Sequence, residues 1–200
     1  KLIDLYQNGF HVPNGAVLDS NAFELFINEN SALKNAIKLL IASDTEANYD
    51  LVEKEISGSI FPTLLEQELV QFVDLMHQNG VNSFAVRSSG TLEDGENSSF
   101  AGQFESFLNI RSLASLKSAI VKCWISLFGK KVMTYCKNNA INIEDFAMCV
   151  VIQEQLVSDF SGVVFTVNPL TGEDKVMVVE TVKGVGESLV QGNNITDMYL

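Results

Sequence analysis

Apolar residues recur at intervals of three and four over much of the chain, which is the spacing of one face of an α-helix. Leu33, Ile37, Leu40 and Ile41 form one such set. Helix ends are marked by glycine or asparagine, as at Gly9. The pattern predicts helices at residues 1–8, 20–30, 31–43, 46–57, after Pro62 as far as Asn79, and 112–138.

Short, continuous apolar runs are typical of buried strands. They predict strands at residues 16–18, 83–86, 104–110, 146–152, 162–167 and 175–181. The last two runs flank Asn168–Gly172, whose residues favour a turn, so a hairpin is expected there. Helices dominate the first part of the chain and strands the last part. The sequence therefore predicts an α+β fold with a helix-rich lobe at 1–140 and a strand-rich lobe at 141–200.

A long segment of small and polar residues, 88–103, follows the strand that ends at Arg87. A guanidinium offers a fixed fork of donors to phosphate oxygens, and glycines such as Gly102 let backbone N–H groups approach them. Hydroxyls such as that of Ser106 could add donors. The alternative is a surface loop beside a solvated arginine. Three acidic residues of this loop either point outward or hold Mg²⁺: Glu93, Asp94 and Glu96.

Composition narrows the classes of function. The chain has 200 residues and a net charge of −12, which disfavours nucleic acids and anionic membranes as partners. Only two arginines, Arg87 and Arg111, are available to meet an anion. There is no apolar run long enough for a membrane span. Three cysteines, an odd number without a CxxC pair or zinc-ligand spacing, fit a reducing cytosol, so a cytoplasmic location is expected.

Several segments, in order, carry a resemblance to a known family. They include Ala85–Asp94, Ser99–Gln103, Ser161–Thr166 and Gly184–Glu187. Together they resemble the N-terminal ATP-binding domain of the phosphoenolpyruvate synthase and pyruvate phosphate dikinase family, which rifampin phosphotransferase shares. The resemblance implies an ATP-grasp-like, two-lobed fold, here truncated at both ends, because the family's Gly-Gly-Lys should precede Lys1 and its metal-binding Glu and Gln-x-Arg-Pro should follow position 200.

The resemblance also implies roles for individual residues. Arg87 would contact the ATP phosphates and be catalytic, with Gly102 in the loop above them. Ser106 would lie beside the nucleotide, and Gln153 at its adenine end. Mg²⁺ would bridge the phosphates, and ATP would phosphorylate a histidine on a separate swivelling domain. That domain would pass the group to pyruvate or another acceptor bound by a further domain. This fragment alone is expected to be inactive. The alternative is a degenerate, non-catalytic lobe that binds nucleotide or a protein partner.

Overall fold

The computed structural model describes residues 2–90, 106–139, 141–143, 148–169, 171–186 and 197–199, in two compact units that meet between residues 155 and 156. The first unit contains, in order, α1 (Leu2–Gln7), β1 (Gly15–Leu18), α2 (Ser20–Glu29), α3 (Ser31–Ala42), α4 (Glu46–Ser57), α5 (Thr63–Gln78), β2 (Phe84–Gly90), β3 (Ser106–Ile110), α6 (Leu113–Ser126), α7 (Lys130–Asn138) and β4 (Met148–Glu154). The second contains β5 (Phe160–Phe165), β6 (Val178–Lys183) and β7 (Asp197–Tyr199). Helix and strand together confirm the α+β class.

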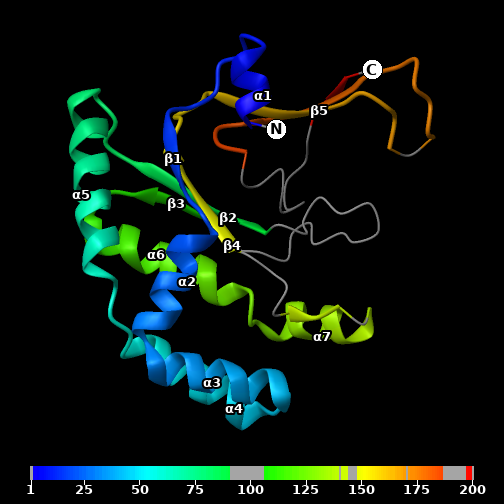
Figure 1. Ribbon diagram of the computed structural model, residues 1–200. Coiled ribbons are helices and arrows are strands. Elements are labelled where there is room, and N and C mark those ends of the chain that lie inside the picture. The colour runs from blue at the N-terminus through cyan, green and yellow to red at the C-terminus, as the bar shows by residue number, and fades with distance from the viewer. Residues whose placement is uncertain are drawn as a thin grey trace. The chain divides into compact units, whose positions relative to one another are not determined.

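An antiparallel sheet in the order β1-β4-β2-β3 forms the centre of the first unit (Figure 1). Helices α2 and α6 pack against one of its faces, and α5 packs on α6. Side chains alternate between the two faces of a strand. On β4 the residues toward the helices, Met148, Val150 and Ile152, are fully buried and define the core face. Val151 and Gln153 alternate with them and lie on the opposite, open face.

The core is built around the ring of Trp124, which is fully buried. The rings of Phe26, Phe61 and Phe23 surround it, with centroids 5.1, 6.0 and 6.1 Å away. Burial of each large apolar side chain contributes about 1.5–3 kcal/mol. These contacts join α2 and α6. The apolar residues that recur at helical spacing on these helices therefore cover the core face of the sheet.

Most of the predicted helices are confirmed, including the three between residues 20 and 57. Ser112 caps α6, since its hydroxyl accepts a hydrogen bond from the Ser115 backbone N–H at 3.2 Å. The prediction of one helix over 112–138 is wrong. Gly129 adopts an extended conformation with ψ of 149°, so α6 ends before it and α7 begins at Lys130. None of the helices in the described part of the chain is long and apolar enough to cross a bilayer.

The two units divide after Gln155, whereas the sequence predicted two lobes divided at 140. Strand β4 belongs to the first unit because it pairs with both β1 and β2. In the second unit β5 pairs with β6 and β6 with β7, all antiparallel. The predicted hairpin is confirmed, with Asn168 accepting hydrogen bonds from Thr171 and Gly172 in its turn.

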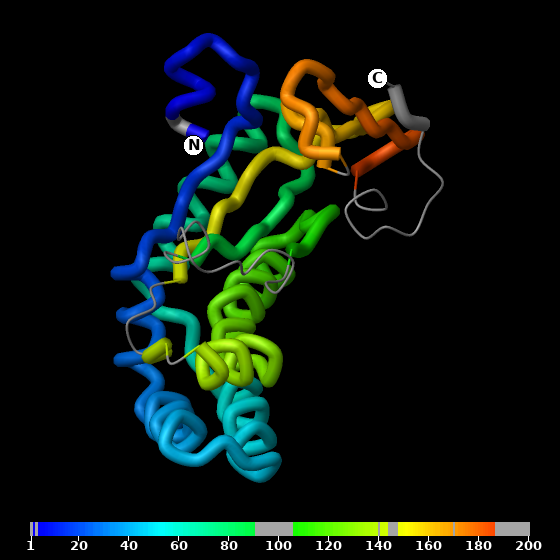
Figure 2. The backbone as a smooth tube through the Cα atoms, turned by 90° about the vertical axis from the view of Figure 1, so that its right-hand side faces the viewer, coloured from blue at the N-terminus to red at the C-terminus, as the bar shows by residue number. Residues whose placement is uncertain are grey.

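Helices α3 and α4 lie together at the end of the first unit that is remote from α1 in both views (Figures 1 and 2). The buried side chain of Asn30 stabilises this end of the unit. Asn30 donates from Nδ2 to the carbonyls of Phe26 and Ile60 and accepts from the Ile60 N–H at 2.6 Å. The loop that enters α5 is thereby tied to the junction of α2 and α3.

Candidate functional site

Arg87 lies on β2, on the open face of the sheet. It is directly opposite Ser106 of β3 and Val151 of β4. Residues paired in this way in antiparallel strands project to the same face, with Cβ atoms about 5 Å apart. Arg87 is exposed, and no described carboxylate lies within ion-pair distance of its guanidinium. Among the described residues, therefore, no ion pair neutralises this charge.

The predicted end of the strand at Arg87 is wrong. Strand β2 continues to Gly90, because Ser88, Ser89 and Gly90 each pair with a residue of β4. The ladder of β4 outweighs the low strand propensity of serine and glycine. Arg87 therefore projects from the middle of a rigid strand rather than from a loop. Gly102 and the loop residues from 91 to 105 lie outside the described residues.

Gln153 lies on the same open face as Arg87. It pairs with Ala85 of β2 on one side and Gly15 of β1 on the other. The diagonal relation of Gln153 to Arg87 in the ladder corresponds to roughly 7–8 Å. The structure therefore brings together three of the four residues singled out in the sequence: Arg87, Ser106 and Gln153.

A cavity of about 310 Å³ adjoins Gln153, and we call it the sheet cavity. Its walls come from α1, the bend before β1, and the open faces of β1 and β4. They are mostly apolar, and they include Leu2, Tyr6, Pro13, Val17, Val151 and Gln153. Cavities of this size with few polar groups are typical of small-molecule sites. Sequence reasoning missed Leu2, Tyr6 and Val17, although the alternation along β1 could have assigned Val17 to the open face.

Gly15 allows β1 to run close to β4 beside this cavity. A Cβ atom at this position would collide with the carbonyl oxygen of Ile152 and lie 3.1 Å from Cα and Cγ of Gln153. Only glycine fits this approach without displacing the neighbouring strand. The glycine thus fixes the position of Gln153 against the sheet cavity.

Cys149 shares the open face with these residues, opposite Ser89. Burial raises the pKa of its thiol, and the charge of Asp19 raises it further, against a smaller lowering by the backbone of Ser20. Cys149 is therefore protonated at neutral pH, and a thiol is a poor nucleophile. No group of three His, Cys, Asp or Glu side chains that could hold a metal ion occurs among the described residues.

Taken together, the open face offers a mostly apolar cavity lined by the amides of Asn14 and Gln153, and the cation of Arg87 lies two residues further along the ladder from Gln153. This arrangement suits a ligand with a flat apolar ring at one end and an anionic group at the other. Hydrogen bonds from an arginine to a phosphate or carboxylate are among the stronger ones in proteins.

Comparison with known proteins gives matches over the whole chain. Residues 1–200 match the family described as the pyruvate phosphate dikinase AMP/ATP-binding domain. The chain is 33% identical over 199 residues to an uncharacterized phosphotransferase of Bacillus subtilis, covering 100% of this chain and 22% of the relative. It is 32% identical over 195 residues to rifampicin phosphotransferase of Bacillus cereus, covering 96% and 22%.

A third relative is the probable phosphoenolpyruvate synthase of Archaeoglobus fulgidus. It is 35% identical over 197 residues, which cover 94% of this chain and 26% of the relative. The chain therefore spans about a quarter of the length of the curated relatives it matches.

Proposed function

Because the chain belongs to the family of pyruvate phosphate dikinase AMP/ATP-binding domains, we propose that it is the ATP-binding part of a phosphotransferase. In this proposal ATP phosphorylates a histidine on a separate swivelling domain of the whole protein, and that domain carries the group to an acceptor. Relatives named as a probable phosphoenolpyruvate synthase and a rifampicin phosphotransferase support pyruvate or another acceptor.

One observation carries the proposal: Arg87, Ser106 and Gln153 share the open face of one sheet. Arg87 would bind the phosphates of ATP, and Ser106 would lie beside the nucleotide. Gln153 would meet the adenine end, with the ring in the sheet cavity. Gly102 would belong to the loop over the phosphates. The fold would be an ATP-grasp-like one, with the strands of 156–200 contributing to its second lobe.

The physical role of Arg87 follows from charge. Phosphoryl transfer needs little covalent chemistry from the protein, which acts mainly by positioning ATP and stabilising developing negative charge. Arg87 meets this need because it is held on a paired strand and is one of only two arginines in a chain of net charge −12. The described residues offer no cluster of ligands for Mg²⁺, so no metal-binding role is assigned to them.

The proposal is tested by calorimetric titration of the chain with Mg·ATP, comparing Arg87→Ala with Arg111→Ala. Arg111 is the matched control because it is exposed and follows β3 at the end remote from Ser106. We expect Arg87→Ala to weaken binding by about tenfold or more, which corresponds to at least about 1.4 kcal/mol. Arg111→Ala should change it by less than about twofold. Equal effects of the two variants, or no binding of Mg·ATP, would contradict the proposal.

A further inference from the structure

A second cavity, of about 360 Å³, lies between α2, α3 and the residues on both sides of α7, and we call it the helix cavity. Its walls are the side chains of Phe23, Ile27, Ile37, Ile41, Phe128 and Ile143 together with Leu127. None of these residues belongs to the open face of the sheet. The helix cavity is thus a site distinct from the one proposed for ATP.

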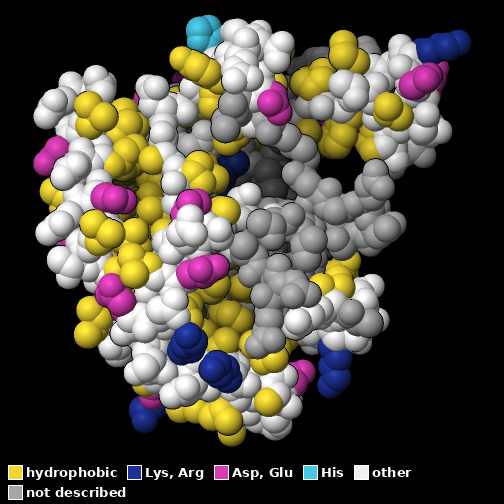
Figure 3. Space-filling model, in the orientation of Figure 1, with side chains coloured by type: hydrophobic (Ala, Val, Ile, Leu, Met, Phe, Trp, Pro, Cys, Tyr) yellow, Lys and Arg dark blue, Asp and Glu magenta, His cyan; other side chains and the backbone are white. Residues whose placement is uncertain are grey.

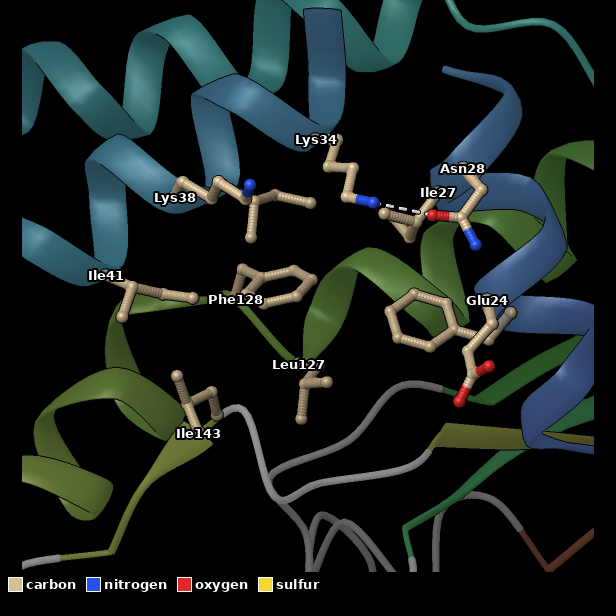
Figure 4. A pocket seen from close by; sticks show the side chains of 11 residues that line it. Glu24, Ile27, Asn28, Lys34, Lys38, Ile41, Leu127, Phe128 and Ile143 are labelled. Atoms are coloured by element: carbon tan, nitrogen blue, oxygen red, sulfur yellow. Dashed lines mark hydrogen bonds between the residues drawn. The ribbon is translucent and has the colours of Figure 1, made fainter. Parts of the chain in front are cut away.

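Two lysines of α3, Lys34 and Lys38, line the same cavity. Figure 4 shows their side chains extending from α3 above the labelled apolar residues. In the space-filling view, yellow side chains form a hollow bordered by dark blue ones (Figure 3). The Lys34 ammonium donates a hydrogen bond to Oδ1 of Asn28 at 2.7 Å, and no described carboxylate forms an ion pair with either lysine.

The placement of these charges is unfavourable in the absence of a ligand. Lys34 and Lys38 are four residues apart on α3, so they lie on one face of the helix and repel each other. Lys34 also lies near the N-terminus of α3, where a cation opposes the helix dipole. Helix α3 contains no acidic residue that could offset them. An anion between the two ammonium groups would relieve both effects.

Among the described residues that line the helix cavity, Glu24 is the one with an acidic side chain. Its side chain is exposed, and Figure 4 shows its carboxylate turned away from the two lysines. The cavity therefore has an apolar body and one positively charged side, in a chain whose net charge is −12. Such a local reversal of charge gives the cavity a preference for anions.

We infer that the helix cavity binds a small amphipathic carboxylate, with its apolar body among the phenylalanine and isoleucine side chains and its head group between Lys34 and Lys38. The volume is at the lower end of the range for small-molecule pockets, which suits a medium-chain or aromatic acid. Burial of the apolar body supplies affinity, and the two ammonium groups select for an anionic head.

Decanoate is a suitable probe, titrated into the chain below its micellar concentration and followed by calorimetry. Decanol has the apolar chain without the carboxylate, and acetate has the carboxylate without the chain. Each therefore tests one part of the ligand separately. We expect saturable binding of decanoate, weakened about tenfold in the double variant K34Q/K38Q. Lys54→Gln is the matched control, since Lys54 is an exposed lysine of the neighbouring helix α4 and does not line the cavity. It should change the affinity by less than about twofold.

The fluorescence of Trp124, the only tryptophan of the chain, locates the ligand. Its ring centroid is 6.1 Å from that of Phe23, which lines the cavity. A brominated decanoate bound there should quench Trp124, and Ile41→Phe should abolish quenching by filling the cavity. Absence of saturable binding, binding without quenching, equal affinity for decanol and decanoate, or unchanged affinity in K34Q/K38Q would each overturn the inference. The lysine variants leave the apolar walls of the cavity unchanged, so they remain informative if Ile41→Phe does not fold.

Discussion

Arg87 of β2 lies directly opposite Ser106 of β3, so the guanidinium and the hydroxyl leave the open face of the sheet side by side. A register irregularity lies just beyond this pair, between Phe84 and Val86. At this point Asn109 of β3 adopts a left-handed conformation with φ of 57°. A bulge of this kind inserts one residue and re-aims the side chains that follow it. The irregularity thus sets which residue of β3 faces Arg87.

This pairing predicts that Arg87 and Ser106 act on the same phosphate group. Ser106→Ala should weaken Mg·ATP binding by about threefold, the size of one neutral hydrogen bond. In the double variant with Arg87→Ala the loss should be smaller than the product of the two single losses, since the ligand shifts once the arginine is gone. Calorimetry of the four proteins measures the coupling. Ser57→Ala, on an exposed turn of α4, is the control, and independent effects at 87 and 106 would refute the shared contact.

Gly15→Ala should destabilise the protein and weaken nucleotide binding together. The added Cβ would collide with the Ile152 carbonyl oxygen and crowd Gln153, so β1 or β4 must move. We expect the free energy of unfolding, measured with urea, to fall by ~1–3 kcal/mol. Gly58→Ala is the control, because its nearest neighbour to a new Cβ is the Glu55 carbonyl oxygen at 3.8 Å. A variant at Gly15 as stable as the one at Gly58 would show that the strands tolerate a side chain there.

Asn30→Ala should be among the more destabilising single polar substitutions in the first unit. It removes three hydrogen bonds of a buried side chain and leaves the carbonyl of the fully buried Phe26 and the backbone groups of Ile60 without this partner. We expect a loss of ~2–4 kcal/mol in the free energy of unfolding. Asn79→Ala serves for comparison, since its amide donates only to the Leu75 carbonyl on an exposed surface. Similar losses for the two variants would mean that Asn30 contributes no more than an ordinary helix-end asparagine.

Tyr49 should make the protein less stable in alkaline solution. Burial raises the pKa of its phenol above the ordinary value of about 10, and a hydrogen bond to Asp44 and the charges of Asp44 and Glu46 raise it further. The folded protein then keeps a proton that the unfolded chain releases. The stabilisation is fully present below pH about 10 and is lost as the pH rises above it.

Urea unfolding from about pH 8 to about pH 11 checks this dependence. The free energy of unfolding should decline more steeply in the wild type than in Tyr49→Phe over the upper part of the range. Asp44→Asn should also make the decline shallower, since it removes the negative charge that disfavours the ionised phenol. Parallel curves for the wild type and Tyr49→Phe would exclude this origin of the pH dependence.

Sequence reasoning predicted the elements whose spacing is set by the core. The apolar residues of α2 and α3 recur at helical intervals because Phe26, Leu33 and Leu40 are fully buried. The errors occur where neighbours in space decide the conformation. Gly129 could belong to a continuous helix or to a break, and Ser88 to a loop or a strand. Only the packing around Leu127 and the ladder to β4 distinguish these alternatives.

In the candidate site, too, individual residues could be predicted from the sequence, whereas their arrangement in space could not. Arg87 could be singled out because cations are few in this chain, and Gln153 because it ends an apolar strand. Their shared face depends on β4 lying between β1 and β2, an order that local patterns do not contain. The roles of Arg87, Gly102, Ser106 and Gln153 stay predictions, and the titration with Mg·ATP is what tests the first of them.

Because α2 and α6 pack against one face of the four-stranded sheet and a cavity lies on the other, neighbouring residues of β4 are under different selective pressures. Replacing Val150 or Ile152 alters a filled volume, and natural selection will remove most such changes for their effect on folding. Val151 and Gln153 border the sheet cavity, so changes there act first on what is bound. Substitutions at the alternate, cavity-facing positions of this strand can thus change the bound ligand during evolution while the ability of the protein to fold is left almost intact.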